Sequence, residues 1–322
     1  MSLIGWKELI KNYMTKFAIG CLVQWYECDI INEYIDTLKR AIDSYEGEVI
    51  VDITICVNQQ LEKAENSEIL RECIRKINDS CSPFKLNFEY GIYTIADYRR
   101  EFNDKYSKLV DVLFWGESDM LVPSQAIASI LLLQDAVKDT TPKWIGFFAT
   151  CKMWDDSWKV LEHPKLTNLE RDPYAWYGTR SYMDYSKMEE INLDVESPQI
   201  ETTNNYKFNG CGLIMSSELI NSGVNIPASC FFTHEDTALM NKMLLMFNKE
   251  VPMYIFKNIL LVHNREHPNK RKYIAEEIGK DINEQRKSNE WYKVASEMSK
   301  HNAYNFMKQT KTFKWKDVWE AL

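Results

Sequence analysis

Residues 109–119 read LVDVLFWGESD, an apolar run that ends in two carboxylates. The length and content of Leu109–Trp115 predict a buried strand. If the chain stays extended beyond Trp115, Glu117 and Asp119 point the same way, because side chains alternate along a strand. Both carboxylates could then face one ligand, and Mg²⁺ and Mn²⁺ are hard cations that share oxygen ligands with a diphosphate. The alternative is a solvated acidic turn, since two carboxylates at this spacing are common.

Strands and helices alternate on both sides of this run. Further strands are predicted at residues 17–25, 49–57, 88–93, 144–148, 207–215 and 253–263. Helices are predicted after Asp29 as the N-cap, from Ser67, at 96–108, from Pro123 to Val137, and at 236–247. The alternation predicts an α/β fold, with a mostly parallel mixed sheet flanked by helices. In such sheets ligands bind beyond the carboxyl ends of the strands, where the two carboxylates lie.

Two later segments depart from this alternation. Residues 151–206 are polar and rich in tryptophan and tyrosine, including Trp176. A long irregular segment in a compact domain is often functional, so we expect this one to form much of the acceptor side of a site. The tail, residues 268–322, is predicted to be helical.

Composition and charge narrow the class of protein. The 322 residues are 45% hydrophobic and 27% charged, with a net charge of −8, which is typical of a globular protein. The acidic balance argues against duplex DNA as the main partner, because DNA-binding proteins are usually basic. The eight cysteines form no C-x-x-C pair, so we interpret them as reduced thiols of a cytoplasmic protein. No stretch has the pattern of a signal peptide or a transmembrane segment.

Three further motifs could carry chemistry. Asn209–Met215 reads NGCGLIM, and its two glycines permit close approach by a ligand, although a bulge or tight turn explains them as well. The triplet His234-Glu235-Asp236 precedes an amphipathic segment. A carboxylate there could deprotonate an acceptor hydroxyl or could cap the helix, with Asp236 as the cap. His263 ends an apolar strand and is either structural or, if it lies near Asp119, a metal ligand.

Other catalytic signatures are absent from the sequence. It contains no G-x-G-x-x-G, no G-x-x-x-x-G-K-[ST], no G-x-S-x-G and no H-E-x-x-H.

The order of the motifs resembles that of the GT-A glycosyltransferases, in particular the inverting family 2, over residues 15 to 268. The family's D-x-D metal motif is similar to Glu117-Ser118-Asp119, with glutamate in the first place. Its glycine-rich strand looks like the segment that begins at Asn209, and its E-D pair before a helix looks like Glu235-Asp236. Its late metal-binding histidine is matched by His263, whereas the arginine-asparagine pair before the D-x-D strand is represented only by Arg99-Arg100.

This resemblance implies a GT-A-like, Rossmann-like domain and a metal-dependent transfer of a sugar from a UDP-linked donor to an acceptor hydroxyl, with inversion. The implied cofactor is Mn²⁺ or Mg²⁺. The implied organisation is an extension at 1–14, a glycosyltransferase domain at 15–268 with a donor half at 15–122 and an acceptor half at 151–268, and a helical segment at 269–322.

The resemblance also implies roles for individual residues. Asp119, Glu117 and His263 would hold the metal, and Asp236 or Glu235 would be the catalytic base. The other implied contacts are Trp25, Tyr26, Arg99, Arg100 and Ser118 on the donor side, and Gly210, Gly212, Trp176 and His234 on the acceptor side. Core packing is an equal alternative for Trp25 and Tyr26.

Two other functions stay open at this point. The acceptor could be a hydroxymethylated base in DNA, with aromatic residues between 151 and 185 stacking on bases and Lys270-Arg271-Lys272 contacting phosphate. Alternatively, the chain could be a non-catalytic carbohydrate-binding protein of the same fold, for which Glu117 in place of aspartate is the only indication.

Overall fold

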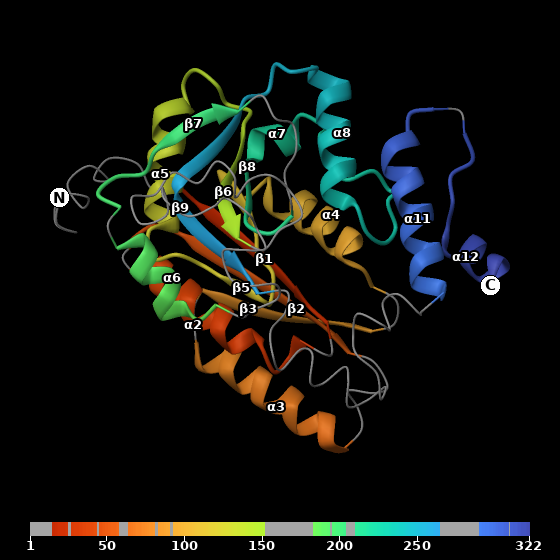
Figure 1. Ribbon diagram of the computed structural model, residues 1–322, viewed down its shortest axis with the longest axis horizontal. Helices are drawn as coiled ribbons and strands as arrows, with labels where there is room; N and C mark the ends of the chain where they lie inside the picture. Colours follow the sequence, from red (N-terminus) through yellow and green to blue (C-terminus); the bar gives the residue numbers. More distant parts are fainter. Residues whose placement is uncertain are drawn as a thin grey trace.

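The described part of the chain is built around a mixed sheet of nine strands, and helices cover both faces of this sheet (Figure 1). The structure is a computed structural model that describes residues 15–24, 27–43, 45–57, 64–80, 83–90, 93–151, 183–193, 195–203, 210–264, 290–308 and 310–322. The strand order is β3-β2-β1-β4-β8-β6-β9-β5, and β7 also pairs with β9. The predicted α/β class and mixed sheet are therefore confirmed.

The first half of the sheet is parallel. It consists of β3 (Phe84–Tyr90), β2 (Val49–Val57), β1 (Phe17–Val23) and β4 (Val112–Trp115). Every residue of β1 is buried, because helices cover both faces of this half. This two-sided burial explains why the strand is a continuous apolar run rather than an alternating one.

The second half of the sheet contains antiparallel as well as parallel strand pairs. β8 (Leu213–Ser216) runs antiparallel to both β4 and β6 (Ile145–Cys151), and β6 is parallel to β9 (Met253–His263). Two short strands, β5 (Met120–Leu121) and β7 (Ile200–Thr203), each pair antiparallel with β9. The β5–β9 pairing matters for function, because it sets Met120 opposite His263.

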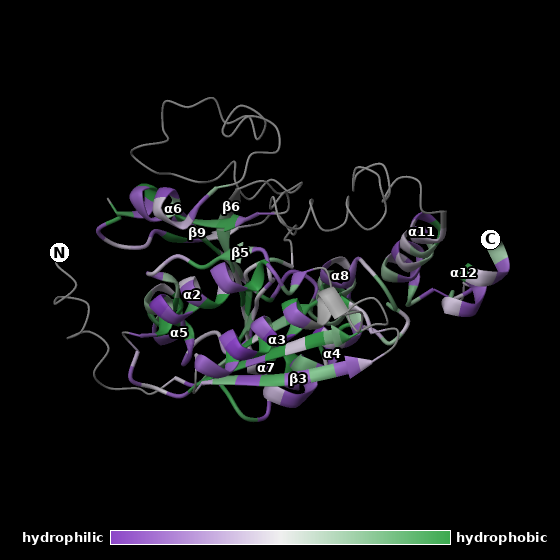
Figure 2. Cartoon of the chain, turned by 90° about the horizontal axis from the view of Figure 1, so that it is seen from below, coloured by the Kyte–Doolittle hydropathy of each residue, from purple (hydrophilic) through white to green (hydrophobic). Residues whose placement is uncertain are grey.

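Successive residues of β1 belong to two different cores. Phe17, Ile19 and Cys21 pack in the core beneath α2 (Ile31–Ile42), α3 (Ala64–Asp79) and α5 (Ala126–Val137). Ala18 and Leu22 pack on the opposite face, beneath α4 (Ile95–Tyr106), α7 (Ser217–Asn221) and α8 (Glu235–Phe247). Figure 2 shows mainly hydrophobic colouring along the central strands and mainly hydrophilic colouring on helices α2 and α6.

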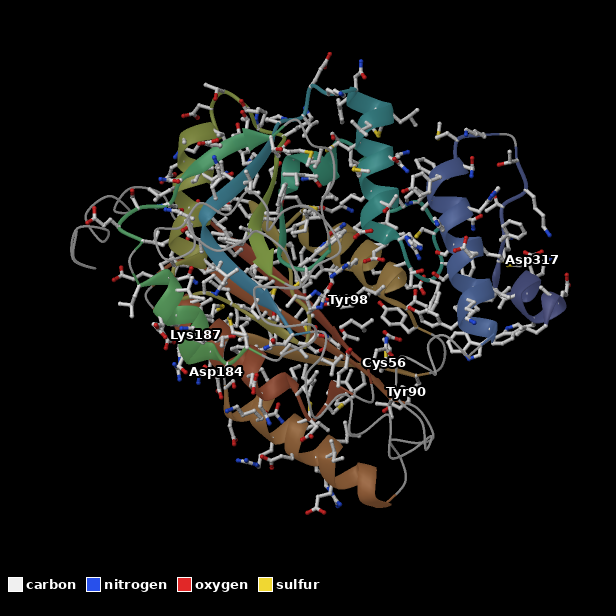
Figure 3. All side chains as sticks on the ribbon, viewed as in Figure 1. Cys56, Tyr90, Tyr98, Asp184, Lys187 and Asp317 are labelled. Atoms are coloured by element: carbon white, nitrogen blue, oxygen red, sulfur yellow. The ribbon has the colours of Figure 1, made fainter. Side chains whose placement is uncertain are left out.

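Side-chain contacts fix the covering helices to the sheet. Tyr98 of α4 points toward the strands, and its hydroxyl donates a 2.9 Å hydrogen bond to the carbonyl oxygen of Asp52 (Figure 3). Helix α6 (Tyr185–Asn192) packs on Leu260 and Val262 of β9, and the carboxylate of its N-cap Asp184 accepts from the backbone N–H of Lys187.

The predicted C-terminal helical extension is confirmed for the described residues. It consists of α11 (Glu290–Asn305) and α12 (Trp315–Ala321), which lie beside α8 at one side of the molecule (Figure 1). A small core of Phe231, Ala295 and Val318 joins these helices to the loop before α8. Every helix among the described residues is too short or too polar to span a lipid bilayer.

Element ends differ from the predictions at several places. Strands β2 and β9 have the predicted bounds, but β3 lies earlier, at 84–90, and β4 and β8 are shorter than predicted. Helix α3 begins at Ala64 rather than Ser67, and α5 begins at Ala126 rather than Pro123. Asp29 is not the N-cap of α2: that position is occupied by Ile30, without a side-chain hydrogen bond.

Candidate active site

The carboxylates that follow β4 are held in place by backbone hydrogen bonds to two other strands. The Gly116 N–H donates to the Gly20 carbonyl at 2.7 Å, so the chain leaving β4 stays beside β1. After the turn at Glu117, the chain pairs with β9, and the Asn264 N–H donates to the Asp119 carbonyl at 2.7 Å. These bonds place Asp119 next to His263.

Glu117, Asp119 and His263 form one cluster. His263 Nε2 lies 2.9 Å from Glu117 Oε2 and 3.1 Å from Asp119 Oδ1. Asp119 and His263 are each 5% exposed, whereas the Glu117 side chain is 24% exposed. The cluster is thus buried on one side and open to an approaching ligand at Glu117.

The charges of this cluster shift the pKa values of its members. Burial acts to lower the pKa of His263, but its neighbours Cys211, Asp119 and Glu117 outweigh that effect and raise the pKa well above its ordinary value. Burial acts to raise the pKa of Glu117, but His263 and Arg99 outweigh it and lower that pKa to about 2. Glu117 is therefore a carboxylate at any pH near neutrality, as a cation ligand must be.

A thiol completes the cluster. One ligand atom each from Glu117, Cys211 and His263 lies within 4.8 Å of the other two. Cys211 is 2% exposed, and burial raises its pKa to about 12. The next residue, Gly212, fixes this position because its N–H donates to the Trp115 carbonyl at 2.9 Å while its φ is +74°. A positive φ favours glycine.

These residues fit a divalent cation. Metal–ligand bonds to oxygen, nitrogen and sulfur in proteins are about 2.0–2.3 Å, so two ligands of one ion lie at most about 4.6 Å apart. The three atoms all lie within 4.8 Å of one another, which is close to that limit. Cys211 was not among the predicted ligands, although it lies in the glycine-rich stretch that the sequence singled out as an acceptor contact.

Arg99 connects this cluster to a second one. From α4, its Nη2 donates to Glu117 Oε1 at 2.7 Å and to the Gly210 carbonyl at 2.9 Å, while its Nη1 donates to Glu235 Oε1. The guanidinium also lies over the ring of Trp115, 4.6 Å from the centroid. A Cβ atom at Gly210 would overlap the Arg99 guanidinium, so this position requires glycine.

The second cluster consists of Glu235 and Asp236, which lie in the first turn of α8. Burial raises the pKa of Glu235 to about 7 against the opposing charge of Arg99, and Asp236 adds to the rise. Burial also raises the pKa of Asp236, whose Oδ1 accepts from the Thr237 N–H at 2.6 Å. The N-cap of α8 is His234, with a φ of 66°, so the alternative in which Asp236 caps the helix is wrong.

The structure places the other predicted contacts as follows. Arg100 donates to the Cys230 carbonyl in the loop before α8 and pairs with Asp97 of its own helix. Ser118 is buried between the two carboxylates of the motif. His234 Nε2 lies 3.5 Å from Ser296 Oγ of α11.

Several predicted contacts lie outside the described residues. They are Trp25, Tyr26 and Trp176, together with Lys270-Arg271-Lys272 and most of the aromatic segment at 151–206. The DNA-acceptor hypothesis depended on the last two.

Arg99→Met is expected to lower the free energy of unfolding by about 3–5 kcal/mol, because it leaves two carboxylates without their buried partner. Urea denaturation measures the change. Arg75→Met is the matched control: Arg75 also bridges two carboxylates, Glu72 and Asp79, but its side chain is 61% exposed. A much smaller change is expected there. Equal losses in the two variants would show that the buried bridge contributes no more than a surface pair.

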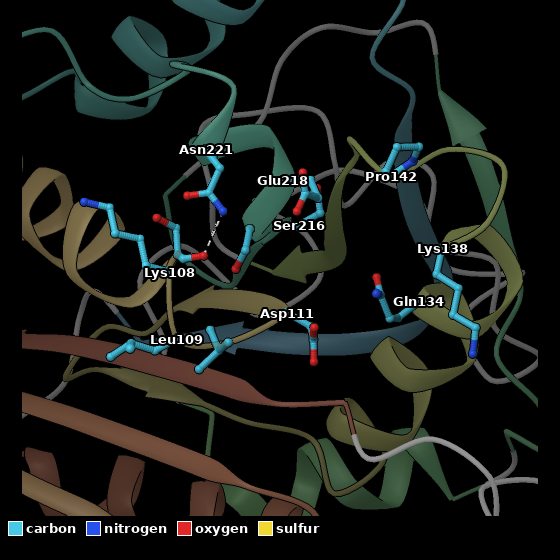
Figure 4. Close-up of a pocket in the computed structure, with 12 residues that line it drawn as sticks. Lys108, Leu109, Asp111, Gln134, Lys138, Pro142, Ser216, Glu218 and Asn221 are labelled. Atoms are coloured by element: carbon cyan, nitrogen blue, oxygen red, sulfur yellow. Dashed lines mark hydrogen bonds between the residues drawn. The ribbon is translucent and has the colours of Figure 1, made fainter.

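The surface also has a pocket away from these two clusters. This pocket of about 330 Å³ is lined by residues including Lys108, Asp111, Gln134 and Glu218 (Figure 4). Asp111 precedes β4, whereas Glu117 follows it. The pocket and the carboxylate clusters therefore lie at opposite ends of this strand. The clusters, rather than this pocket, combine groups that can hold a cation with groups that can accept a proton.

Comparison with known proteins gives structural similarities only. No family model and no curated protein sequence matches the chain. Among solved structures, it is similar to TarS 1-349 from S. aureus, at 13% identity and a TM-score of 0.48, over 94% of this chain and 77% of that one.

Two other solved structures are similar at the same level. One is the mannosyltransferase PcManGT from Pyrobaculum calidifontis in complex with GDP-Man and Mn²⁺, at 12% identity and a TM-score of 0.48, over 99% and 85% of the two chains. The other is glucosyl-3-phosphoglycerate synthase from Mycobacterium tuberculosis with Mg²⁺ and UDP, at 12% identity and a TM-score of 0.44, over 87% and 83%. The function of this chain is therefore inferred from its own residues.

Proposed function

We propose that this chain is a metal-dependent glycosyltransferase that moves a sugar from a nucleotide-sugar donor to an acceptor hydroxyl. The observation that supports the proposal is the pair of clusters joined by Arg99. One cluster, Glu117-Asp119-His263, has ligands for a divalent cation. The other, Glu235-Asp236, has carboxyl groups with raised pKa values. An inverting, metal-assisted glycosyl transfer uses both functions, one for the leaving diphosphate and one for the acceptor proton.

The nucleotide-sugar donor would bind beyond the carboxyl end of β4. Glu117, Asp119 and His263 would hold Mn²⁺ or Mg²⁺ there, and the bound cation supplies positive charge that stabilises the departing diphosphate. Glu117 is the most exposed of the three, so the donor would approach from its side. We propose UDP as the nucleotide.

The acceptor hydroxyl would bind beside the first turn of α8, which carries Glu235 and Asp236. The acceptor oxygen forms a bond to the anomeric carbon of the sugar as the bond from that carbon to the diphosphate oxygen breaks. The hydroxyl proton passes to Asp236, or to Glu235, and the bonding electron pair leaves with the diphosphate. This single displacement inverts the anomeric configuration.

The rate of transfer is expected to fall as the pH drops below about 7. Below that pH Glu235, with a pKa of about 7, is protonated. Its charge then no longer offsets the charge of Arg99 beside Asp236, so Asp236 becomes a weaker base. The kcat/KM–pH profile measures this effect. Glu235→Gln should remove the inflection near 7, and a wild-type rate that stays level down to pH 5 would contradict the prediction.

The function is tested with a panel of nucleotide sugars, with and without Mn²⁺. We expect one donor to raise the unfolding temperature only with the metal, and slow release of the nucleoside diphosphate when no acceptor is present. Binding of a sugar without any release would favour the carbohydrate-binding alternative. A panel in which no nucleotide sugar binds would overturn the proposal.

A further inference from the structure

The thiol of Cys211 distinguishes this metal site from one made of oxygen and nitrogen ligands alone. Its sulfur lies within 4.8 Å of a Glu117 carboxylate oxygen and a His263 ring nitrogen. The three ligands come from the chain after β4, the turn before β8, and the end of β9. Segments distant in the sequence thus converge on one point.

The backbone around Cys211 is fixed on both sides. The carbonyl of Gly210 accepts from Arg99 at 2.9 Å, and the N–H of Gly212 donates to Trp115 at 2.9 Å. Cys211 is 2% exposed and forms no disulfide. Its sulfur therefore already lies near the other ligands, and binding of a metal ion would need no large conformational change.

Sulfur and oxygen ligands favour different cations. Thiolate is a soft ligand that suits ions such as Zn²⁺, whereas Mg²⁺ is bound by carboxylate, carbonyl and water oxygens. A site with one sulfur, one imidazole nitrogen and the carboxylate of Glu117 has mixed character. Such a donor set favours Zn²⁺ and Co²⁺ over Mg²⁺.

We propose that Cys211 is a metal ligand and that the site selects a thiophilic divalent cation of the Zn²⁺ and Co²⁺ type over Mg²⁺. The inference rests on the proposed function for the location of the metal site. Its test, however, needs neither a donor nor an acceptor.

The test is the absorption spectrum of the metal-free full-length chain titrated with Co²⁺. A Co²⁺–thiolate bond produces a charge-transfer band in the near ultraviolet that oxygen and nitrogen ligands do not produce. We expect one equivalent of Co²⁺ to produce this band and one equivalent of Zn²⁺ to abolish it. Calorimetry should show Mg²⁺ binding at least about tenfold more weakly than Co²⁺.

Substitutions of cysteine test whether the sulfur that binds the metal is that of Cys211. Cys211→Ser should lose the band and bind Co²⁺ at least about tenfold more weakly, with Mg²⁺ affinity unchanged. Cys230→Ser is the matched control, because burial also raises the pKa of Cys230 to about 12 but its sulfur lies near Thr233 and Ser299 instead. It should keep the band. If Cys211→Ser does not fold, Cys211→Asp supplies an oxygen ligand and should bind Mg²⁺ more tightly while losing the band.

The outcomes separate this inference from the proposed function. A wild-type Co²⁺ complex without the band, or a Cys211 variant that keeps it, overturns the inference even if the chain transfers sugar. The band without any nucleotide-sugar binding supports the inference and overturns the function. A chain that binds no divalent cation overturns both.

Discussion

Asp119→Ala is expected to abolish metal-dependent donor binding and sugar transfer while leaving the fold intact. Asp119 Oδ1 lies 3.1 Å from His263 Nε2, so the substitution removes a carboxylate from the cation cluster itself. Its backbone carbonyl still accepts from Asn264, and the β5–β9 pairing does not need the side chain. Calorimetry with a nucleotide sugar and Mn²⁺ measures the effect.

The size of the expected loss comes from the charge on the leaving group. A diphosphate leaves with negative charge that a bound cation offsets by several kcal/mol, so loss of the cation lowers the rate by several orders of magnitude. Asp135→Ala is the control: Asp135 is a surface carboxylate on α5, paired with Lys138. It should behave as wild type. Donor affinity for Asp119→Ala that equals wild type in the presence of Mn²⁺ would show that Asp119 is not a ligand.

The sequence was sufficient to predict the strands that are buried on both faces. Strands β2 and β9 have the predicted ends because their apolar runs are bounded by polar residues or turns. The apolar run at residues 109–115 predicted too long a strand. Its first residue, Leu109, is 55% exposed, and the N–H groups of Leu109 and Val110 bond back to Tyr106 at the end of α4. The apolar side chains of Leu109 and Val110 do not show whether these residues follow a helix or belong to a strand.

The order of strands in the second half of the sheet could not be read from the sequence. β8 runs antiparallel between β4 and β6, and this depends on how the chain returns across the sheet rather than on any local pattern. Another tertiary pairing, between β5 and β9, brings His263 to Asp119. The sequence indicated the chemistry of both residues, but their proximity was only an expectation.

Arg99 shows why the rest of the candidate site was harder to predict. From the resemblance it was expected to contact the donor, yet the structure gives it Glu117, Glu235 and the Gly210 carbonyl as partners. Glu235 is separated from it by 136 positions, and no spacing rule relates them. Cys211 was missed for a similar reason, because the glycines around it indicated a ligand contact without showing which side chain would face the cluster.

Asp236→Asn is expected to lower the turnover number at least about a hundredfold, because general-base assistance is typically worth about 10² to 10⁴ in rate. The substitution is a mild one for the fold. The N-cap of α8 is His234 rather than Asp236, and an asparagine oxygen can still accept from the Thr237 N–H as Asp236 does. Donor binding and the unfolding temperature should therefore stay close to wild type, and only the chemical step should slow.

Glu235→Gln decides between the two carboxylates of this turn. Glu235 is buried and bonded to Arg99, whereas Asp236 is only partly buried, so Asp236 is the better placed of the two to meet an acceptor hydroxyl. We therefore expect Glu235→Gln to alter the pH profile more than the maximal rate. Single-turnover assays with a saturating donor measure the chemical step in both variants. If Asp236→Asn transfers sugar at the wild-type rate and Glu235→Gln does not, the base is Glu235. If both variants remain fully active, neither carboxylate takes the proton, and the inverting displacement proposed for this site is wrong.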